Sequence, residues 1–257
     1  MWMRKVLCMF LCAGMMLLCP GVCGEEGVEN APRSFHVEVI SVGQENSAAP
    51  RIYIYHTHTC EAFDPSGGMY KETEKWRTRD SANNMVRVGE ELTKLLRKAG
   101  FFVYHDVTEY ELPDISTAYA RSLDALEKTM DAPFDLYLDL HRDSYSIGNG
   151  ANTVEKDGRI YARLLFLVGK GSGQTGVDEK PDWQRNERIA SALSDGMNDL
   201  VPEICRGVSL KSGRYNQHIQ PACLLVEVGN NKNLLSEALA AMEPLALSVC
   251  RYFDALH

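Results

Sequence analysis

Residues 52–61 read IYIYHTHTCE, and this stretch decides the fold. Its first half, residues 52–55, is short, apolar, β-branched and aromatic, which is typical of a buried strand. Directly after that strand come His56, His58 and Glu61. Because sites in open α/β sheets form at the carboxyl ends of strands, the stretch predicts a sheet with a polar site at its edge.

From this stretch to the end of the chain, predicted strands alternate with predicted helices. After the strand at 52–55, apolar runs predict strands at residues 101–104, 134–140, 160–168 and 222–228. Apolar stripes of helical spacing predict helices at 81–99, from Tyr119 to Met130, from Ile189 to Leu200, and from Leu234 onward with a kink or break at Pro244. We therefore predict an α/β fold: a mixed, largely parallel sheet flanked by helices on both faces.

The N-terminus has the composition of an export segment. Arg4 and Lys5 precede an uncharged, largely apolar run over residues 6–23, and the small residues around Cys23 suit cleavage by a signal peptidase. The run is also about long enough to anchor the chain in a membrane, so both forms stay open. Either form places the domain outside the cytoplasm, at the extracytoplasmic face of the membrane. The predicted division is a signal peptide or membrane anchor at 1–24, a linker with an edge strand near 35–40 at 25–50, and a catalytic domain at 51–257.

Charge and cysteine content exclude two classes of protein. Residues 25–257 carry 25 basic and 35 acidic residues, so a nucleic-acid partner is not expected. Only four cysteines lie beyond residue 24, which is too few for a disulfide scaffold, although one bridge is open.

Three predicted strands carry histidine or carboxylate side chains at or near their ends. Beside His56 and His58, the sequence places Asp139 and His141 at the end of a second strand and Glu227 in the last one. Imidazole and carboxylate are the ligands of catalytic zinc, where three protein ligands leave a fourth position for water. Period-two spacing puts His56 and His58 on one face of an extended chain, and likewise Asp139 and His141. The pattern predicts a Zn²⁺ site without fixing its ligand set.

Two residues at these strand ends indicate chemistry beyond metal binding. Glu227 interrupts the aliphatic strand LLVEV at 224–228, where a carboxylate is costly unless it is paired or liganded. It is therefore a candidate general base for a metal-activated water. Cys60 lies beside the histidines, so a cysteine peptidase using Cys60 with His56 or His58 is an alternative. A non-catalytic wall-binding or scaffold protein is a second alternative.

Five motifs together resemble stage II sporulation protein P, a family related to the zinc N-acetylmuramoyl-L-alanine amidases. They are IYHTHTCE at 54–61, VRVGEEL at 86–92, DLHRD at 139–143, SGRYNQH at 212–218 and LVEVG at 225–229. The resemblance runs in order over about residues 51–241. It implies a zinc amidase-like fold and a sporulation enzyme that degrades septal peptidoglycan during engulfment. It also implies amidase activity, a second endopeptidase activity on stem peptides, and work alongside stage II sporulation proteins D and M.

The resemblance also implies a ligand set for the metal. The family's first metal histidine corresponds to His58 or His56, and the second to His141. The wider amidase family takes its third ligand, a glutamate, from the start of the first long helix, where this sequence has Asp80. Glu61 competes with Asp80 for that role.

The remaining roles follow from the same resemblance and from the polar loop before the last strand. Glu227 corresponds to the family's catalytic glutamate. Two basic residues are candidates for stabilising the oxyanion, namely Arg214 and His218. Three further residues are candidates for gripping the substrate: Arg142, Tyr215 and Asn216.

Overall fold

The computed structural model describes residues 49–66, 70–144, 150–171, 182–220 and 222–256. These residues fall in one compact unit, residues 42–257. The predicted leader, linker and edge strand near 35–40 lie outside the described residues, so the division of the chain stays a prediction. Among the described helices, none is both long enough and apolar enough to cross a membrane.

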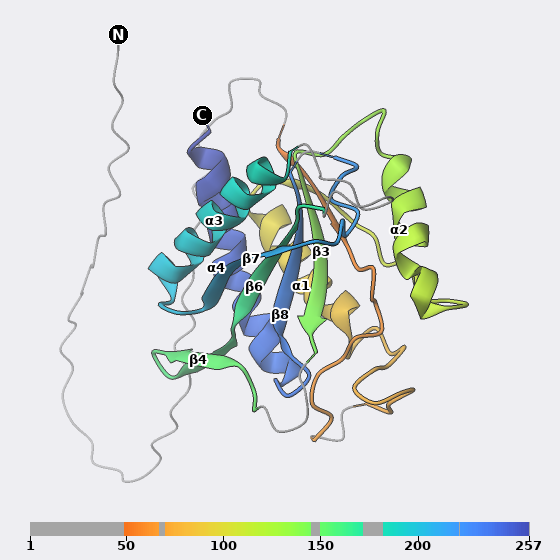
Figure 1. Ribbon diagram of the computed structural model, residues 1–257. Coiled ribbons are helices and arrows are strands. Elements are labelled where there is room, and N and C mark those ends of the chain that lie inside the picture. The colour runs from red at the N-terminus through yellow and green to blue at the C-terminus, as the bar shows by residue number, and fades with distance from the viewer. Residues whose placement is uncertain (1–48, 67–69, 145–149, 172–181, 221, 257) are drawn as a thin grey trace, which may run out of the picture. The chain divides into compact units, whose positions relative to one another are not determined.

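A six-stranded sheet forms the centre of the domain (Figure 1). Its strands lie in the order β2-β1-β3-β8-β6-β7. Their bounds are Arg51–Tyr55 for β1, Phe102–His105 for β2, Leu136–Asp143 for β3, Leu164–Gly169 for β6, Cys205–Lys211 for β7 and Cys223–Asn230 for β8. Four of the pairings are parallel, and only β6 with β8 is antiparallel. The predicted mixed, largely parallel sheet is confirmed.

Helices cover both faces of this sheet, as predicted. Their bounds are Met85–Lys98 for α1, Ala118–Glu127 for α2, Trp183–Leu200 for α3 and Leu235–Asp254 for α4. Helices α1 and α3 each pack against α4 on one face, and α2 lies apart from them at the other side of the sheet (Figure 1). A hairpin of β4, Thr153–Lys156, and β5, Arg159–Ala162, stands outside the main sheet.

The alternation of side chains along β1 explains why the sheet has a hydrophobic cluster on each face. Ile52 and Ile54 point into the large core that α1, α3 and α4 share, whereas Tyr53 and Tyr55 point into a smaller cluster with Leu126 of α2. Successive side chains of a strand face opposite sides of the sheet, so one strand serves both layers. Within the described residues no disulfide joins the cysteines, and Cys223 Sγ instead lies 3.9 Å from the Tyr55 hydroxyl.

Three sequence predictions differ from the structure. The predicted strand at 160–168 is two strands, β5 and β6. Strand β7 was not predicted, because it is an edge strand whose sequence, CRGVSLK, lacks a continuous apolar pattern.

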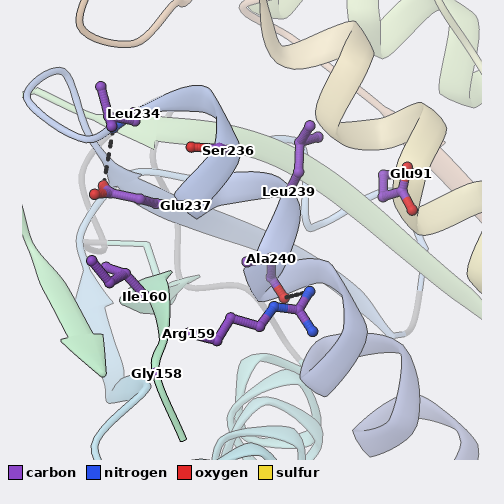
Figure 2. Close-up of a pocket in the computed structure, with 9 residues that line it drawn as sticks. All are labelled: Glu91, Gly158, Arg159, Ile160, Leu234, Ser236, Glu237, Leu239 and Ala240. Atoms are coloured by element: carbon purple, nitrogen blue, oxygen red, sulfur yellow. Dashed lines mark hydrogen bonds between the residues drawn. The ribbon is translucent and has the colours of Figure 1, made fainter. Parts of the chain in front are cut away.

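The third difference is Pro244, which does not break α4. A proline inside a helix leaves the carbonyl four residues earlier without its helical donor. Here that carbonyl belongs to Ala240, and Arg159 Nη2 donates to it at 3.4 Å (Figure 2). The hairpin thus partly replaces the hydrogen bond that the proline removes, and α4 is continuous across Pro244.

Candidate active site

The predicted polar strand ends meet at one edge of the sheet. Strand β3 lies between β1 and β8 and is parallel to both. The register sets Tyr55 opposite Asp139 and His141 opposite Glu227. Because all three strands run in the same direction, the side chains that follow or end them share one edge. Asp139 and His141 lie on one face, as their spacing predicts.

His56 and His58 do not share a face, which corrects the expectation from their spacing. Strand β1 ends at Tyr55 and the chain then turns, so the alternation stops between the two histidines. His56 is fully buried, with Nδ1 3.1 Å from the Leu140 carbonyl oxygen and Nε2 2.9 Å from His105 Nε2. Burial and the neighbouring His105 lower the pKa of His56 to about 3. Both of its ring nitrogens are engaged within the fold.

Gly89 of α1 allows this histidine pair to pack under the helix. A Cβ at Gly89 would lie 2.5 Å from the Nε2 atoms of both His56 and His105. Only glycine permits so close an approach of α1 to the pair. This contact ties His56 to the layer opposite α2.

His58 faces the site instead. Its ring lies 5.3 Å from the ring of His141 and 5.6 Å from the ring of Tyr119, both edge to face. Its Nδ1 lies 3.0 Å from Glu111 Oε1. The structure therefore places His58, rather than His56, beside His141.

His141 is surrounded by carboxylates. Nε2 lies 2.9 Å from Asp139 Oδ1, an ion-pair distance with poor alignment for a hydrogen bond, and Nδ1 lies 3.7 Å from Glu61 Oε2. Burial alone would lower the pKa of His141, but Asp139, Glu61 and Glu227 outweigh it and raise that pKa to about 10. This pocket therefore stabilises positive charge.

The carboxylates around His141 are held in place by main-chain donors. Asp139 accepts hydrogen bonds from the amide of Thr57 at 2.8 Å and from its hydroxyl at 2.7 Å. Glu61 accepts one from the amide of Arg142 at 2.8 Å. Fixed acceptors of this kind keep their geometry when a ligand binds.

Glu227 is the least satisfied of these groups. Its Oε2 is buried and has no hydrogen-bond partner. Burial raises the pKa of Glu227 to about 8, and the nearby Glu61 and Asp143 add to that effect while His141 opposes it. A buried carboxylate beside other carboxylates needs a cation or a proton, and the chemistry of this donor set fits a divalent metal.

A second group of potential ligands lies on the far side of His58. Within the described part of the chain, three such atoms come within 4.8 Å of one another only at Cys60, Glu109 and Glu111. Arginines already compensate these carboxylates, because Arg77 pairs with Glu111 and Arg79 lies 3.7 Å from Glu109. Charge there is balanced without a metal, in contrast to the surroundings of Glu227.

Cys60 lacks the properties of a nucleophile. Its thiol donates to Glu109 at 3.5 Å, and burial together with Glu111 and Glu109 raises its pKa to about 12. Reactive cysteines have a lowered pKa and a cationic neighbourhood. The geometry therefore disfavours the cysteine peptidase alternative.

For the zinc-dependent wall hydrolase that the sequence resemblance implies, Cys60→Ser is expected to keep activity within about tenfold of wild type, or about 1.4 kcal/mol of barrier. The serine preserves the small polar side chain and its donor to Glu109. Turnover on purified cell wall at matched zinc content checks this expectation. A loss of about a thousandfold with the metal still bound would support the thiol mechanism instead.

The structure separates the two candidates for the carboxylate ligand. Glu61 is buried next to His141, whereas Asp80 is exposed. The Asp80 carboxylate accepts from Ala82 N at 3.0 Å and from Asn83 Nδ2 at 2.7 Å within its own turn. The geometry favours Glu61, and the ligand role itself stays a prediction.

The predicted substrate-binding residues occupy different environments. Arg142 is buried, and its guanidinium donates to the carbonyl oxygens of Trp76 and Asp143. Asn216 is also buried and donates to Tyr119 O at 2.7 Å, which ties its loop to α2. Both residues therefore stabilise the walls of the site, and direct contact with substrate stays a prediction.

The other predicted residues of that loop are less buried than Asn216. The Tyr215 ring lies 6.0 Å from that of Tyr119, and burial together with the nearby Glu227 raises the pKa of its phenol. Arg214 is half-buried and His218 is exposed. Their roles toward the oxyanion stay predictions.

Two residues of the site, and one partner of His56, were not predicted from the sequence. Tyr119 comes from α2, and its ring stacks on His141 at 6.4 Å. His105 ends β2 and contacts His56, so the rule of polar strand ends, applied to the strand predicted at 101–104, would have found it. Glu111 lies in an irregular loop, where no local pattern indicates a partner 53 residues away.

A cavity elsewhere on the domain lacks this chemistry. Its volume is about 600 Å³, and it lies between β5, the start of α4 and Glu91 of α1 (Figure 2). None of the predicted ligands or catalytic residues lines it. The polar edge of the sheet therefore remains the candidate active site.

Comparison with known proteins agrees with this geometry. The sequence profile of the family described as stage II sporulation protein P (SpoIIP) matches residues 24–249. The chain belongs to this family. The resemblance seen in the five motifs is thereby confirmed. A separate comparison with curated protein sequences finds no match.

Solved structures of amidases share the fold of this SpoIIP family member. The CwlD amidase from Clostridioides difficile, solved in complex with the GerS lipoprotein, has a TM-score of 0.54 and 10% identity over 80% of this chain and 99% of that one. An N-acetylmuramoyl-L-alanine amidase from Clostridium difficile 630 has a TM-score of 0.52 and 13% identity over 82% and 100%. The catalytic domain of the CD27L endolysin targeting Clostridia difficile has a TM-score of 0.50 and 16% identity over 80% and 97%. The domain thus has an amidase-like fold.

Proposed function

We propose that this protein is a zinc-dependent peptidoglycan hydrolase of the N-acetylmuramoyl-L-alanine amidase type. The observation that carries the proposal is the convergence of His58, Glu61, His141 and Glu227 at one edge of the sheet. These four residues supply two imidazoles, a fixed carboxylate and a second carboxylate without a partner. Family membership and the amidase-like fold support the same activity.

In this proposal His58, Glu61 and His141 hold the zinc ion. Their ligand atoms do not all lie within 4.8 Å of one another in this structure. When bound, zinc supplies Lewis acidity toward the scissile carbonyl and a more nucleophilic water at neutral pH.

Glu227 acts as the general base and acid. It lies on β8 directly opposite His141 of β3, so its carboxylate faces the ligand cluster. It accepts a proton from the attacking water and delivers it to the departing amine, which is the nitrogen that linked peptide to sugar. The rings of Tyr119 and Tyr215 pack edge to face at 6.0 Å, and Tyr119 stacks on His141.

The cellular setting extends the same proposal. We place the enzyme at the extracytoplasmic face of the membrane or septal wall, where it degrades septal peptidoglycan during engulfment. Work alongside stage II sporulation proteins D and M, an added endopeptidase activity on stem peptides, and attachment through residues 1–24 belong to this proposal.

The purified protein is expected to carry about one zinc ion and to lose wall hydrolysis in a strong chelator until zinc is restored. Elemental analysis gives the zinc content, and mass spectrometry of digested sacculi identifies the bond that is cut. Release of free stem peptides from the glycan strands supports the amidase. Full activity in metal-free protein would overturn the zinc mechanism, and wall binding without any released product would favour the scaffold alternative.

A further inference from the structure

Both histidines proposed to hold zinc have a carboxylate beside one ring nitrogen. His141 has Asp139 near Nε2, without hydrogen-bond alignment, whereas His58 Nδ1 is at hydrogen-bond distance from Glu111. A carboxylate that accepts a hydrogen bond from one ring nitrogen holds the proton there and leaves the lone pair on the other nitrogen. At His58 the arrangement therefore leaves Nε2 as the metal-binding atom.

Glu111 is itself rigidly placed. Its side chain is only 6% exposed and lies next to the guanidinium of Arg77. Oε2 accepts a hydrogen bond from the amide of Cys60 at 3.1 Å, while Oε1 accepts from both Arg77 and His58. A carboxylate with three donors cannot turn away from His58 without leaving one of them unpaired.

The neighbouring Glu109 provides a contrast on the same loop. It lies 3.5 Å from the Cys60 thiol and 3.7 Å from Arg79, and it makes no described contact with His58. Glu109 therefore shares the acidic surroundings of Glu111 but not its link to the imidazole. Comparing variants of Glu109 and Glu111 therefore separates a general effect of negative charge on zinc binding from a specific effect on His58.

We propose that Glu111 is a positioning residue that fixes the tautomer and the orientation of His58 for metal binding. The inference rests on the proposed zinc site and adds a residue that the sequence did not indicate. Arg77 and the Cys60 amide hold Glu111, and Glu111 holds His58. Carboxylates of this kind raise the basicity of the ligand and reduce its freedom, and their loss weakens metal binding about 10- to 100-fold.

The experiment measures the zinc dissociation constant by competition with a chromophoric chelator for wild type, Glu111→Gln, Glu111→Ala and Glu109→Gln. Glutamine keeps the shape and the acceptor for His58 but removes the charge, so this variant is expected to fold and to bind zinc about tenfold more weakly. Alanine also frees the ring, and its zinc affinity is expected to fall up to about a hundredfold. Glu109→Gln is expected to stay within about threefold of wild type.

Two further readouts distinguish positioning from other roles. The melting temperature of each metal-free variant reports structural damage, and the absorption bands of the cobalt-substituted proteins report the ligand set. We expect the cobalt bands of Glu111→Gln to match wild type, because Glu111 is not a ligand. Loss of those bands in Glu111→Gln, an equal loss of affinity in Glu109→Gln, or a lowered melting temperature with unchanged zinc affinity would each overturn the proposal.

Failure of the inference is distinguishable from failure of the proposed function. If wild-type protein takes up no zinc, the proposed function fails and the role of Glu111 falls with it. If wild type binds zinc and both Glu111 variants bind it equally well, only the positioning role is wrong.

Discussion

Glu227→Gln is expected to slow hydrolysis of peptidoglycan at least about a hundredfold while the protein stays folded and loaded with zinc. Glutamine preserves the size of the side chain on β8 but cannot accept the proton of the attacking water. General acid–base roles are typically worth 10²–10⁴ in rate. Zinc content, melting temperature and turnover on purified sacculi, measured on this one variant, check the expectation.

The three measurements also separate the other roles open to Glu227. If Glu227 is a metal ligand, the variant should lose zinc along with activity. If Glu227 is a structural carboxylate, the melting temperature of the variant should fall while its folded fraction keeps its turnover. Asp143→Asn is a matched control, because Asp143 ends the neighbouring strand and pairs with Arg206 at 2.9 Å. Its turnover is expected to stay within about tenfold of wild type. Near-normal turnover in Glu227→Gln would refute the assignment.

His58→Ala is expected to abolish zinc binding at stoichiometric metal and to lower turnover at least about a thousandfold. The variant removes one of two proposed imidazole ligands, and Lewis-acid activation is worth several kcal/mol of barrier. Because His58 is partly exposed and lies outside the strand, the metal-free fold should tolerate the change. Elemental analysis and turnover at saturating zinc measure the two effects.

His56→Ala is the matched control for that variant. His56 lies two residues earlier, but its ring nitrogens contact the Leu140 carbonyl and His105. Removing the ring leaves these buried groups unpaired, which costs about 1–3 kcal/mol of unfolding free energy, and the folded fraction should still bind zinc. The reverse pattern, zinc loss in His56→Ala alone, would transfer the ligand role to His56.

The apolar pattern of the sequence was sufficient for most of the architecture. Ile52 and Ile54 alternate with Tyr53 and Tyr55, and the geometry of any β-strand puts the two pairs on opposite faces of the sheet. The pattern failed where a tertiary contact replaced a local one. Pro244 was expected to kink or break α4, but α4 is one unbroken helix, and Arg159 of the hairpin donates to the Ala240 carbonyl that the proline leaves without a helical donor. A kink at Pro244 stays a prediction. Strand β7 was missed because an edge strand needs no continuous apolar run.

By itself the sequence determined that polar residues follow three parallel strands, and hence that they meet at one edge of the sheet. The alternation of predicted strands and helices favours parallel neighbours, so residues such as His141 and Glu227 were predicted at the same edge before the path of any loop was known. Only the tertiary structure placed His58, rather than His56, beside His141, because the turn after Tyr55 ends the two-residue period that the sequence implied. It alone also brought Glu111 to His58 across 53 residues, since the path of an irregular loop depends on the contacts that hold it rather than on its own pattern.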